Sequence, residues 1–148
     1  MAGNTLPKCE FQSDKLILKL EATVTASVDS IVPLVDRVLE IASEMECSQG
    51  KEFEIEMALR EALANAVVHG AHSDPSKQIQ LCVACDMQRG MLIVVRDPGH
   101  GFDPDSIPSP LVGQNVFSEH GRGIFLINQL MDEVRYERGG TEIHMVKY

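Results

Sequence analysis

The sequence lacks several features that mark common functional classes. No apolar run approaches the roughly 20 residues needed to span a bilayer; LCVAC and MLIVV are only strand-sized. The N-terminal stretch MAGNTLPKCEFQSD has no apolar signal-peptide core. Basic residues are few: 13 Lys and Arg against 22 Asp and Glu give a net charge of −9, which argues against a general nucleic-acid binder. We therefore expect a cytoplasmic protein with no membrane segment and no direct nucleic-acid contact.

The four cysteines do not form a zinc-binding pattern. Cys82 and Cys85 have C-x-x-C spacing, but they lie in QIQLCVACD, which is typical of a strand. Residues three apart on a strand point to opposite faces, so the two thiols could not easily share a metal ion. Together with Cys9 and Cys47, they are predicted to be reduced cysteines in a cytosolic protein.

The chain does contain the pattern of a single folded domain. With 148 residues, 44% of them hydrophobic and 24% charged, residues 1–148 should form one globular domain, of which 1–14 should be flexible. The expected elements are a strand near 15–24, helices over about 29–47 and 51–70, strands at 78–86 and 91–97, a helix over about 122–132 and a hairpin over 134–147. This order predicts an α+β two-layer sandwich, with a mixed, mostly antiparallel sheet and three helices on one face.

The second expected helix carries polar residues along the border of its apolar face. In EALANAVVHGAH, positions 61–72, Glu61, Asn65 and His69 follow one another at four-residue spacing. A buried polar group needs a partner. For such a helix taken alone, three peripheral polar residues are the simpler interpretation. The helix therefore leaves two alternatives open, a solvated rim or a site that a polar ligand completes.

A second pattern lies in RDPGHGFDP at 96–104. Asp97 ends an apolar strand and is followed by Gly99 and Gly101, which would let the backbone turn tightly against a ligand. A carboxylate in this place can accept a hydrogen bond from an exocyclic amine such as that of adenine. Taken alone, D-x-G-x-G is a weak signal, because glycines often mark ordinary turns.

A third pattern lies in HGRGIFLINQL at 120–130. Gly121 and Gly123 open the third expected helix, and the free N–H groups of a helix N-terminus bind anions. Arg122 adds a positive charge suited to phosphate. The preceding Gly-, Pro- and Ser-rich loop is long for a compact domain, and such loops are usually functional or disordered.

These three patterns, in this order, resemble the motifs of the Bergerat-fold, or histidine-kinase-like, ATPases. Within that group, GRGIFLINQLMDEV and GGTEIHMVKY resemble the closing segments of the bacterial anti-sigma-factor serine kinases. The resemblance extends from about residue 15 to the end of the chain. It implies the Bergerat fold, with ATP and Mg²⁺ as cofactors.

The resemblance also implies a role for each candidate residue. Glu61 would be the catalytic general base, and Asn65 would be the protein ligand of Mg²⁺, one helical turn away. Asp97 and Thr141 would recognise adenine, and Gly99 and Gly101 would allow the adenine ring to approach closely. Phosphate contacts would come from Gly121, Arg122 and Gly123, and residues of about 102–120 would form an ATP lid. His69 would either line the pocket or have a merely structural role.

Three functions remain open from the sequence. The first is a protein serine kinase that phosphorylates an antagonist protein and sequesters a sigma factor, and for which the resemblance implies a homodimer. The alternative is a non-catalytic partner-switching module in which ATP is only a conformational ligand. The third is a plain α+β domain without a nucleotide, which the three ordered motifs disfavour.

Overall fold

The structure, a computed structural model, describes residues 16–86, 89–99 and 119–148. Its elements are β1 (Leu16–Thr25), the 3₁₀ turn η2 (Val28–Ser30), α1 (Ile31–Glu44), α2 (Glu52–Asn65), the π-helical turn η3 (Ala66–Gly70), β2 (Gln78–Asp86), β3 (Gly90–Arg96), α3 (Glu119–Leu130), β4 (Glu133–Glu137), the 3₁₀ turn η6 (Arg138–Gly140) and β5 (Glu142–Lys147). None of the helices in this described part is both long enough and apolar enough to cross a membrane.

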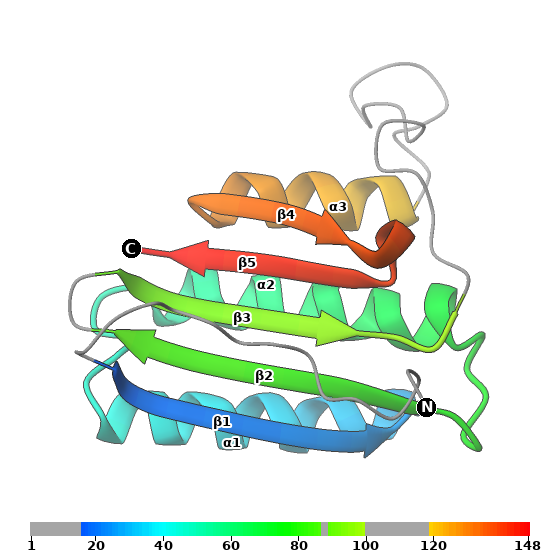
Figure 1. Ribbon diagram of the computed structural model, residues 1–148, viewed down its shortest axis with the longest axis horizontal. Coiled ribbons are helices and arrows are strands. Elements are labelled where there is room, and N and C mark those ends of the chain that lie inside the picture. Colours follow the sequence, from blue (N-terminus) through cyan, green and yellow to red (C-terminus); the bar gives the residue numbers. More distant parts are fainter. Residues whose placement is uncertain (1–15, 87–88, 100–118) are drawn as a thin grey trace.

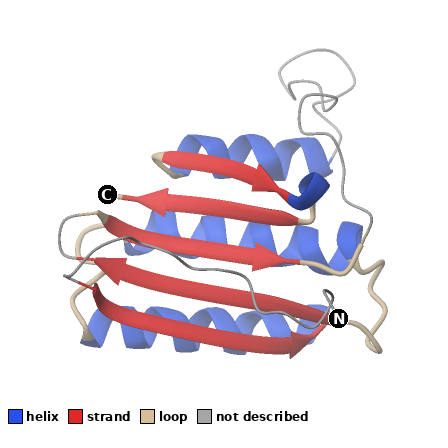
Figure 2. Cartoon of the chain, in the orientation of Figure 1, coloured by secondary structure: helices blue, strands red, loops and turns tan. Residues whose placement is uncertain are grey.

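The five strands form one sheet in the order β1-β2-β3-β5-β4. Every pair of neighbours in it is antiparallel. The helices α1, α2 and α3 lie together on one face of this sheet (Figures 1 and 2). The predicted α+β sandwich is therefore confirmed, and its described strands are antiparallel throughout instead of mixed.

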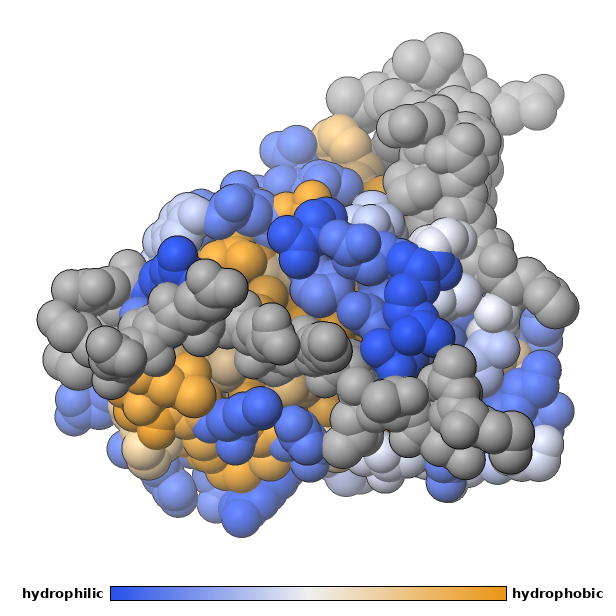
Figure 3. All heavy atoms as spheres, in the orientation of Figure 1, coloured by the Kyte–Doolittle hydropathy of each residue, from blue (hydrophilic) through white to orange (hydrophobic). Residues whose placement is uncertain are grey.

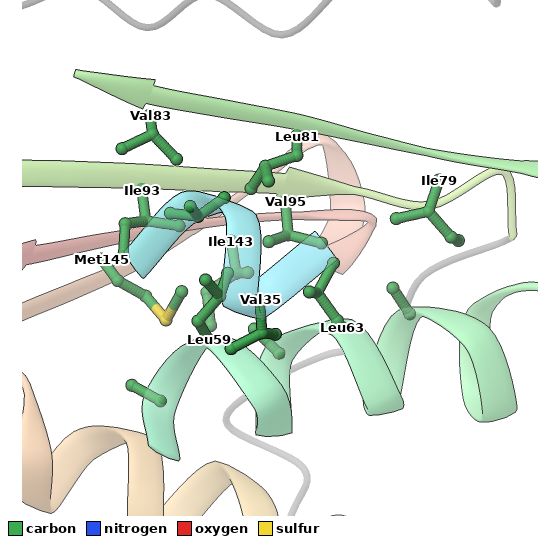
Figure 4. Packing of buried hydrophobic residues seen from close by; sticks show 14 of the residues in the cluster. Val35, Leu59, Leu63, Ile79, Leu81, Val83, Ile93, Val95, Ile143 and Met145 are labelled. Carbon is green, nitrogen blue, oxygen red and sulfur yellow. The ribbon is translucent and has the colours of Figure 1, made fainter. Parts of the chain in front are cut away.

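The core lies between the sheet and the helices. Because side chains alternate along a strand, one set from each central strand faces the helices. The inward-facing residues of β2, β3 and β5 include Ile79, Leu81, Val83, Ile93, Val95, Ile143 and Met145 (Figure 4). Val35 of α1 and Leu59 and Leu63 of α2 meet them and are 0–1% exposed. Burying each such side chain contributes about 1.5–3 kcal/mol, so this layer is the main source of stability.

The start of α1 follows from two residues near its N-terminus. The hydroxyl of Ser27 accepts a hydrogen bond from the backbone N–H of Asp29 at 3.3 Å. Pro33 is the third residue of α1, where its missing N–H breaks no helical hydrogen bond. Both observations agree with the predicted start near Asp29, and the helix ends at Glu44, three residues before the predicted end.

The predicted second helix ends at Gly70 as expected, but it changes character on the way. After Asn65 the chain forms the π-helical turn η3, and the N–H of Ala71 bonds to the carbonyl of Ala66 at 2.9 Å, five residues earlier. Short π-helical turns within helices are rare overall, but those that occur are often found at functional sites. This turn places Gly70 against the end of β3, as described below.

The third helix begins earlier than predicted. It starts at Glu119, three residues before the expected start, so Gly121 and Gly123 both lie within its first two turns. Glycine's low helix propensity disfavours a start before the two glycines, and the observed helix overrides this local preference.

The prediction that all cysteines are reduced was wrong for two of them. Cys47 and Cys85 form a disulfide with a Cα–Cα distance of 6.1 Å. Cys85 lies on the helix-facing side of β2, while Cys82 belongs to an apolar cluster on the other face. The strand argument about opposite faces therefore holds, and it also explains why Cys85, and not Cys82, reaches the segment after α1. Cys9 lies outside the described residues.

Candidate functional site

A cavity of about 80 Å³ lies between α2, α3 and the inner face of the sheet. It brings together four residues that the sequence singled out separately: Asn65, His69, Asp97 and Thr141. The rest of its wall is largely aliphatic and comes from α2, η3, β3, β5 and α3, with Tyr136 of β4 and Gly140 of η6 completing it. A deep apolar cavity with a few polar groups is the usual form of a small-molecule site.

Asp97 is held at one end of this cavity by two backbone hydrogen bonds. Its own N–H donates to the carbonyl of Thr141 at 2.9 Å, and its Oδ1 accepts from the N–H of Gly99 at 2.8 Å. Burial raises the pKa of this carboxyl group above its ordinary value, while the Gly99 hydrogen bond and the charge of His72 act in the opposite direction. The carboxylate is thus oriented before any ligand arrives.

Two glycines make room for Asp97. A Cβ at Gly70 would lie 2.2 Å from Cγ of Asp97, and a Cβ at Gly99 would lie 2.4 Å from the carbonyl oxygen of Gly70. Any side chain at either place would displace the carboxylate or the loop. Gly99 was a predicted site residue, whereas Gly70 was missed, because a glycine at the end of a helix indicates only a stop signal.

A buried ion-pair network braces the strand ends that carry Asp97 and Thr141. On the other face of the sheet, Nε of Arg96 donates to Oε2 of Glu142 at 2.6 Å, and Nε2 of His144 donates to Oε1 of Glu142 at 2.7 Å. Burial acts to raise the pKa of Glu142, but the hydrogen bonds from Arg96 and His144 outweigh it, and the net shift is downward. Figure 3 shows that polar residues gather on this sheet face toward the end of β3. Sequence analysis missed this network.

A second cavity of about 370 Å³ adjoins the first along α2. Asn65 and His69 line both cavities, whereas Glu61 and Gly123 line only the second. A Cβ at Gly123 would lie 2.8 Å from Oε2 of Glu61 and 3.3 Å from Nδ2 of Asn65. Glu61 and Asn65 therefore face the first turns of α3.

The structure places the other predicted site residues as follows. His69 lies four residues after Asn65 and is exposed. Gly121 and Arg122 lie in α3, and the side chain of Arg122 is outside the part of the chain that the structure describes. Gly101 and most of the predicted lid, residues 102–118, also lie outside the described residues.

Comparisons with known proteins bear on the same region. The family model of the histidine kinase-like ATPase domain matches residues 24–147. The serine-protein kinase RsbW of Bacillus subtilis is 32% identical over 117 residues, which cover 73% of this chain and 71% of that protein. RsbW of Staphylococcus epidermidis is 39% identical over 101 residues, 62% of each chain. An anti-sigma F factor of Oceanobacillus iheyensis is 28% identical over 116 residues, covering 74% of this chain and 78% of that protein.

Proposed function

The chain belongs to the histidine kinase-like ATPase domain family, and we propose that it is an ATP-dependent protein serine kinase of the anti-sigma-factor type. In this proposal it phosphorylates a serine of an antagonist protein and sequesters a sigma factor. The names of its relatives support this class. The single observation that carries the proposal is that Glu61 and Asn65 share a cavity that adjoins the one ending at Asp97.

The two cavities together fit the two ends of ATP. The base occupies the aliphatic cavity, where the carboxylate of Asp97 accepts a hydrogen bond from the amine of adenine and Thr141 lies beside it. The phosphates pass Asn65 and His69 into the second cavity. There they meet the N-terminal turns of α3, whose backbone N–H groups favour anions.

Gly121, Arg122 and Gly123 contact the phosphates in this proposal. The glycine at 123 is supported by geometry, because a side chain there would occupy the space between α3 and Glu61. The segment over about 102–120 closes over the nucleotide as a lid. Gly101, with Gly99, permits the close approach of the base.

Asn65 suits the role of protein ligand to Mg²⁺. Its side chain lies on the wall between the two cavities and beside Gly123, and a carboxamide oxygen is a ligand that this ion accepts. Among the described residues there is no group of three His, Cys, Asp or Glu side chains that could hold a metal ion. One protein ligand is compatible with Mg²⁺, which usually completes its shell with water and phosphate oxygens. When bound, the ion would neutralise developing phosphate charge.

Glu61 supplies the general base. The serine oxygen of the antagonist bonds to the γ-phosphorus while the bond from that phosphorus to the bridging oxygen of ADP breaks. The hydroxyl proton passes to the Glu61 carboxylate. Glu61 lines the second cavity and not the aliphatic one, which supports a role in phosphate transfer instead of in holding adenine.

We further propose that the protein acts in the cytoplasm as a homodimer, with protein partners and without direct nucleic-acid contact. The net charge of −9 supports the last point. Light scattering with Mg-ATP at high micromolar protein should give the dimer mass. A monomer under these conditions would remove the dimer from the proposal without affecting the kinase.

The decisive experiment compares Glu61→Ala with Asn65→Ala. Glu61→Ala should keep ATP and partner binding but lower phosphotransfer by about 100- to 10,000-fold, as for a missing general base. Asn65→Ala should weaken both nucleotide binding and transfer, because the phosphates lose their orientation. The matched control is Glu56→Ala, five residues earlier on α2 and paired instead with Arg60 at 3.0 Å.

The measurements are ATP affinity by calorimetry and radiolabel transfer to an antagonist isolated from the host. Normal transfer by Glu61→Ala would refute the assigned mechanism. ATP binding by the unaltered protein without transfer to any partner would replace the kinase with the non-catalytic switching module.

A further inference from the structure

The floor of the aliphatic cavity is a row of three side chains from neighbouring strands. Tyr136 of β4 pairs with Ile143 of β5, and Ile143 pairs with Val95 of β3. All three residues line the cavity. Since adjacent strands lie about 4.8 Å apart, the row spans about 10 Å from β3 to β4.

Asp97 and Tyr136 stand at opposite ends of this floor. Asp97 follows β3 two residues after Val95, while Tyr136 ends the row on β4. Tyr136 is half-buried and packs against the hydrophobic core, so its ring is held in place by its surroundings. It supplies the single phenol among the side chains that line this cavity.

We propose that Tyr136 is a further nucleotide-contacting residue, whose ring walls the base pocket opposite Asp97 and whose hydroxyl donates a hydrogen bond to a purine ring nitrogen. This inference rests on the proposed ATP site. It adds to that site a residue outside the three sequence motifs.

The chemistry of the two ends is complementary to a purine. An ionised aspartate can only accept hydrogen bonds, so it matches the exocyclic amine of adenine. The purine ring nitrogens are acceptors and need a donor. Burial raises the pKa of Tyr136 to about 12, so its hydroxyl remains protonated and able to donate at physiological pH.

The first test is ATP affinity, measured by calorimetry on Tyr136→Phe. Removing one hydroxyl hydrogen bond should weaken binding by about 3- to 10-fold while leaving the ring and the fold in place. The matched control is Tyr148→Phe, which removes the other tyrosine hydroxyl of the chain. Tyr148 is 54% exposed and bonds to Glu133 outside the cavity, so this control should bind ATP as the unaltered protein does.

The second test identifies the partner atom with 1-deaza, 3-deaza and 7-deaza analogues of ATP. The analogue that lacks the bonded nitrogen should weaken binding to the unaltered protein by the same 3- to 10-fold as the hydroxyl deletion, about one hydrogen bond. It should have no further effect on Tyr136→Phe. A merely structural tyrosine would lower the affinity for all analogues equally, and that result would overturn the inference.

The third test is spectroscopic and uses the composition of the chain. The sequence has two tyrosines and no tryptophan, so Tyr148→Phe leaves Tyr136 as the one tyrosine. ATP should then change the ultraviolet absorption and emission of that variant. Unchanged spectra together with an unchanged affinity of Tyr136→Phe would overturn the role of Tyr136 but not the ATP site. Failure of the unaltered protein to bind ATP would instead overturn the proposed function itself.

Discussion

Replacing Asp97 with asparagine should weaken ATP binding and stabilise the ligand-free protein at the same time. The amide keeps the shape of the side chain, and its oxygen can still accept the hydrogen bond that Gly99 donates at 2.8 Å. What disappears is the charge. A hydrogen bond to a charged group contributes about 1.5–3 kcal/mol, so the affinity for ATP should fall by about 10- to 150-fold.

The gain in stability follows from the burial of the carboxylate. Burial raises the pKa of Asp97, which means that the fold disfavours its ionised form. A raised folded-state pKa stabilises the protein below the unfolded pKa, and this contribution is lost as pH rises through the folded value. Asp97→Asn should therefore match the unaltered protein in acid and exceed its free energy of unfolding increasingly as pH rises through this window.

The assays are calorimetry with Mg-ATP and denaturant unfolding over a series of pH values. Asp36→Asn is the matched control, because Asp36 is exposed on α1 and does not line the cavity. ATP affinity of the unaltered protein should itself decrease as pH falls through the raised pKa of Asp97. An unchanged dissociation constant for Asp97→Asn would refute the assignment, and a free energy of unfolding below that of the unaltered protein at neutral pH would refute the burial argument.

Three further predictions concern the second cavity, the ion-pair network and the disulfide. Gly123→Ala should lower phosphotransfer by about 10- to 100-fold, because the added Cβ would lie 2.8 Å from Oε2 of Glu61; transfer at the normal rate would contradict the geometry. Arg96→Leu should lower the free energy of unfolding by about 3–5 kcal/mol at neutral pH, because Glu142 is left buried with one partner fewer. Since the net pKa shift of Glu142 is downward, the loss should shrink as pH falls through that lowered pKa, and a constant loss in urea melts would argue against it. Dithiothreitol should cost up to about 4 kcal/mol in the same melts, since the disulfide joins cysteines 38 residues apart, whereas Cys47→Ser should be equally destabilised and insensitive to the reductant.

The sequence by itself determined the elements and their order, because these depend on signals a few residues long. Alternating and continuous apolar runs predicted β2 with the bounds that the structure has, Gln78–Asp86. Helical spacing together with Gly70 predicted the end of the second helix. The order of the three motifs was enough to predict the family and the α+β fold. Each motif is a short stretch of sequence, and the order of the motifs along the chain requires no knowledge of the tertiary structure.

Only the tertiary structure decided which distant residues meet. Arg96 and Glu142 are 46 residues apart, and nothing in either strand distinguishes them from other outward-facing charges. Cys47 bonds to Cys85 because the segment after α1 folds over the inner face of β2. In the sequence, Tyr136 is indistinguishable from any other strand residue. Only its pairing with Ile143, which in turn pairs with Val95, places it in the cavity. Such contacts depend on how the layers pack. Packing brings together residues that are distant in the sequence, and the local periodicity of each segment does not specify which of them will meet.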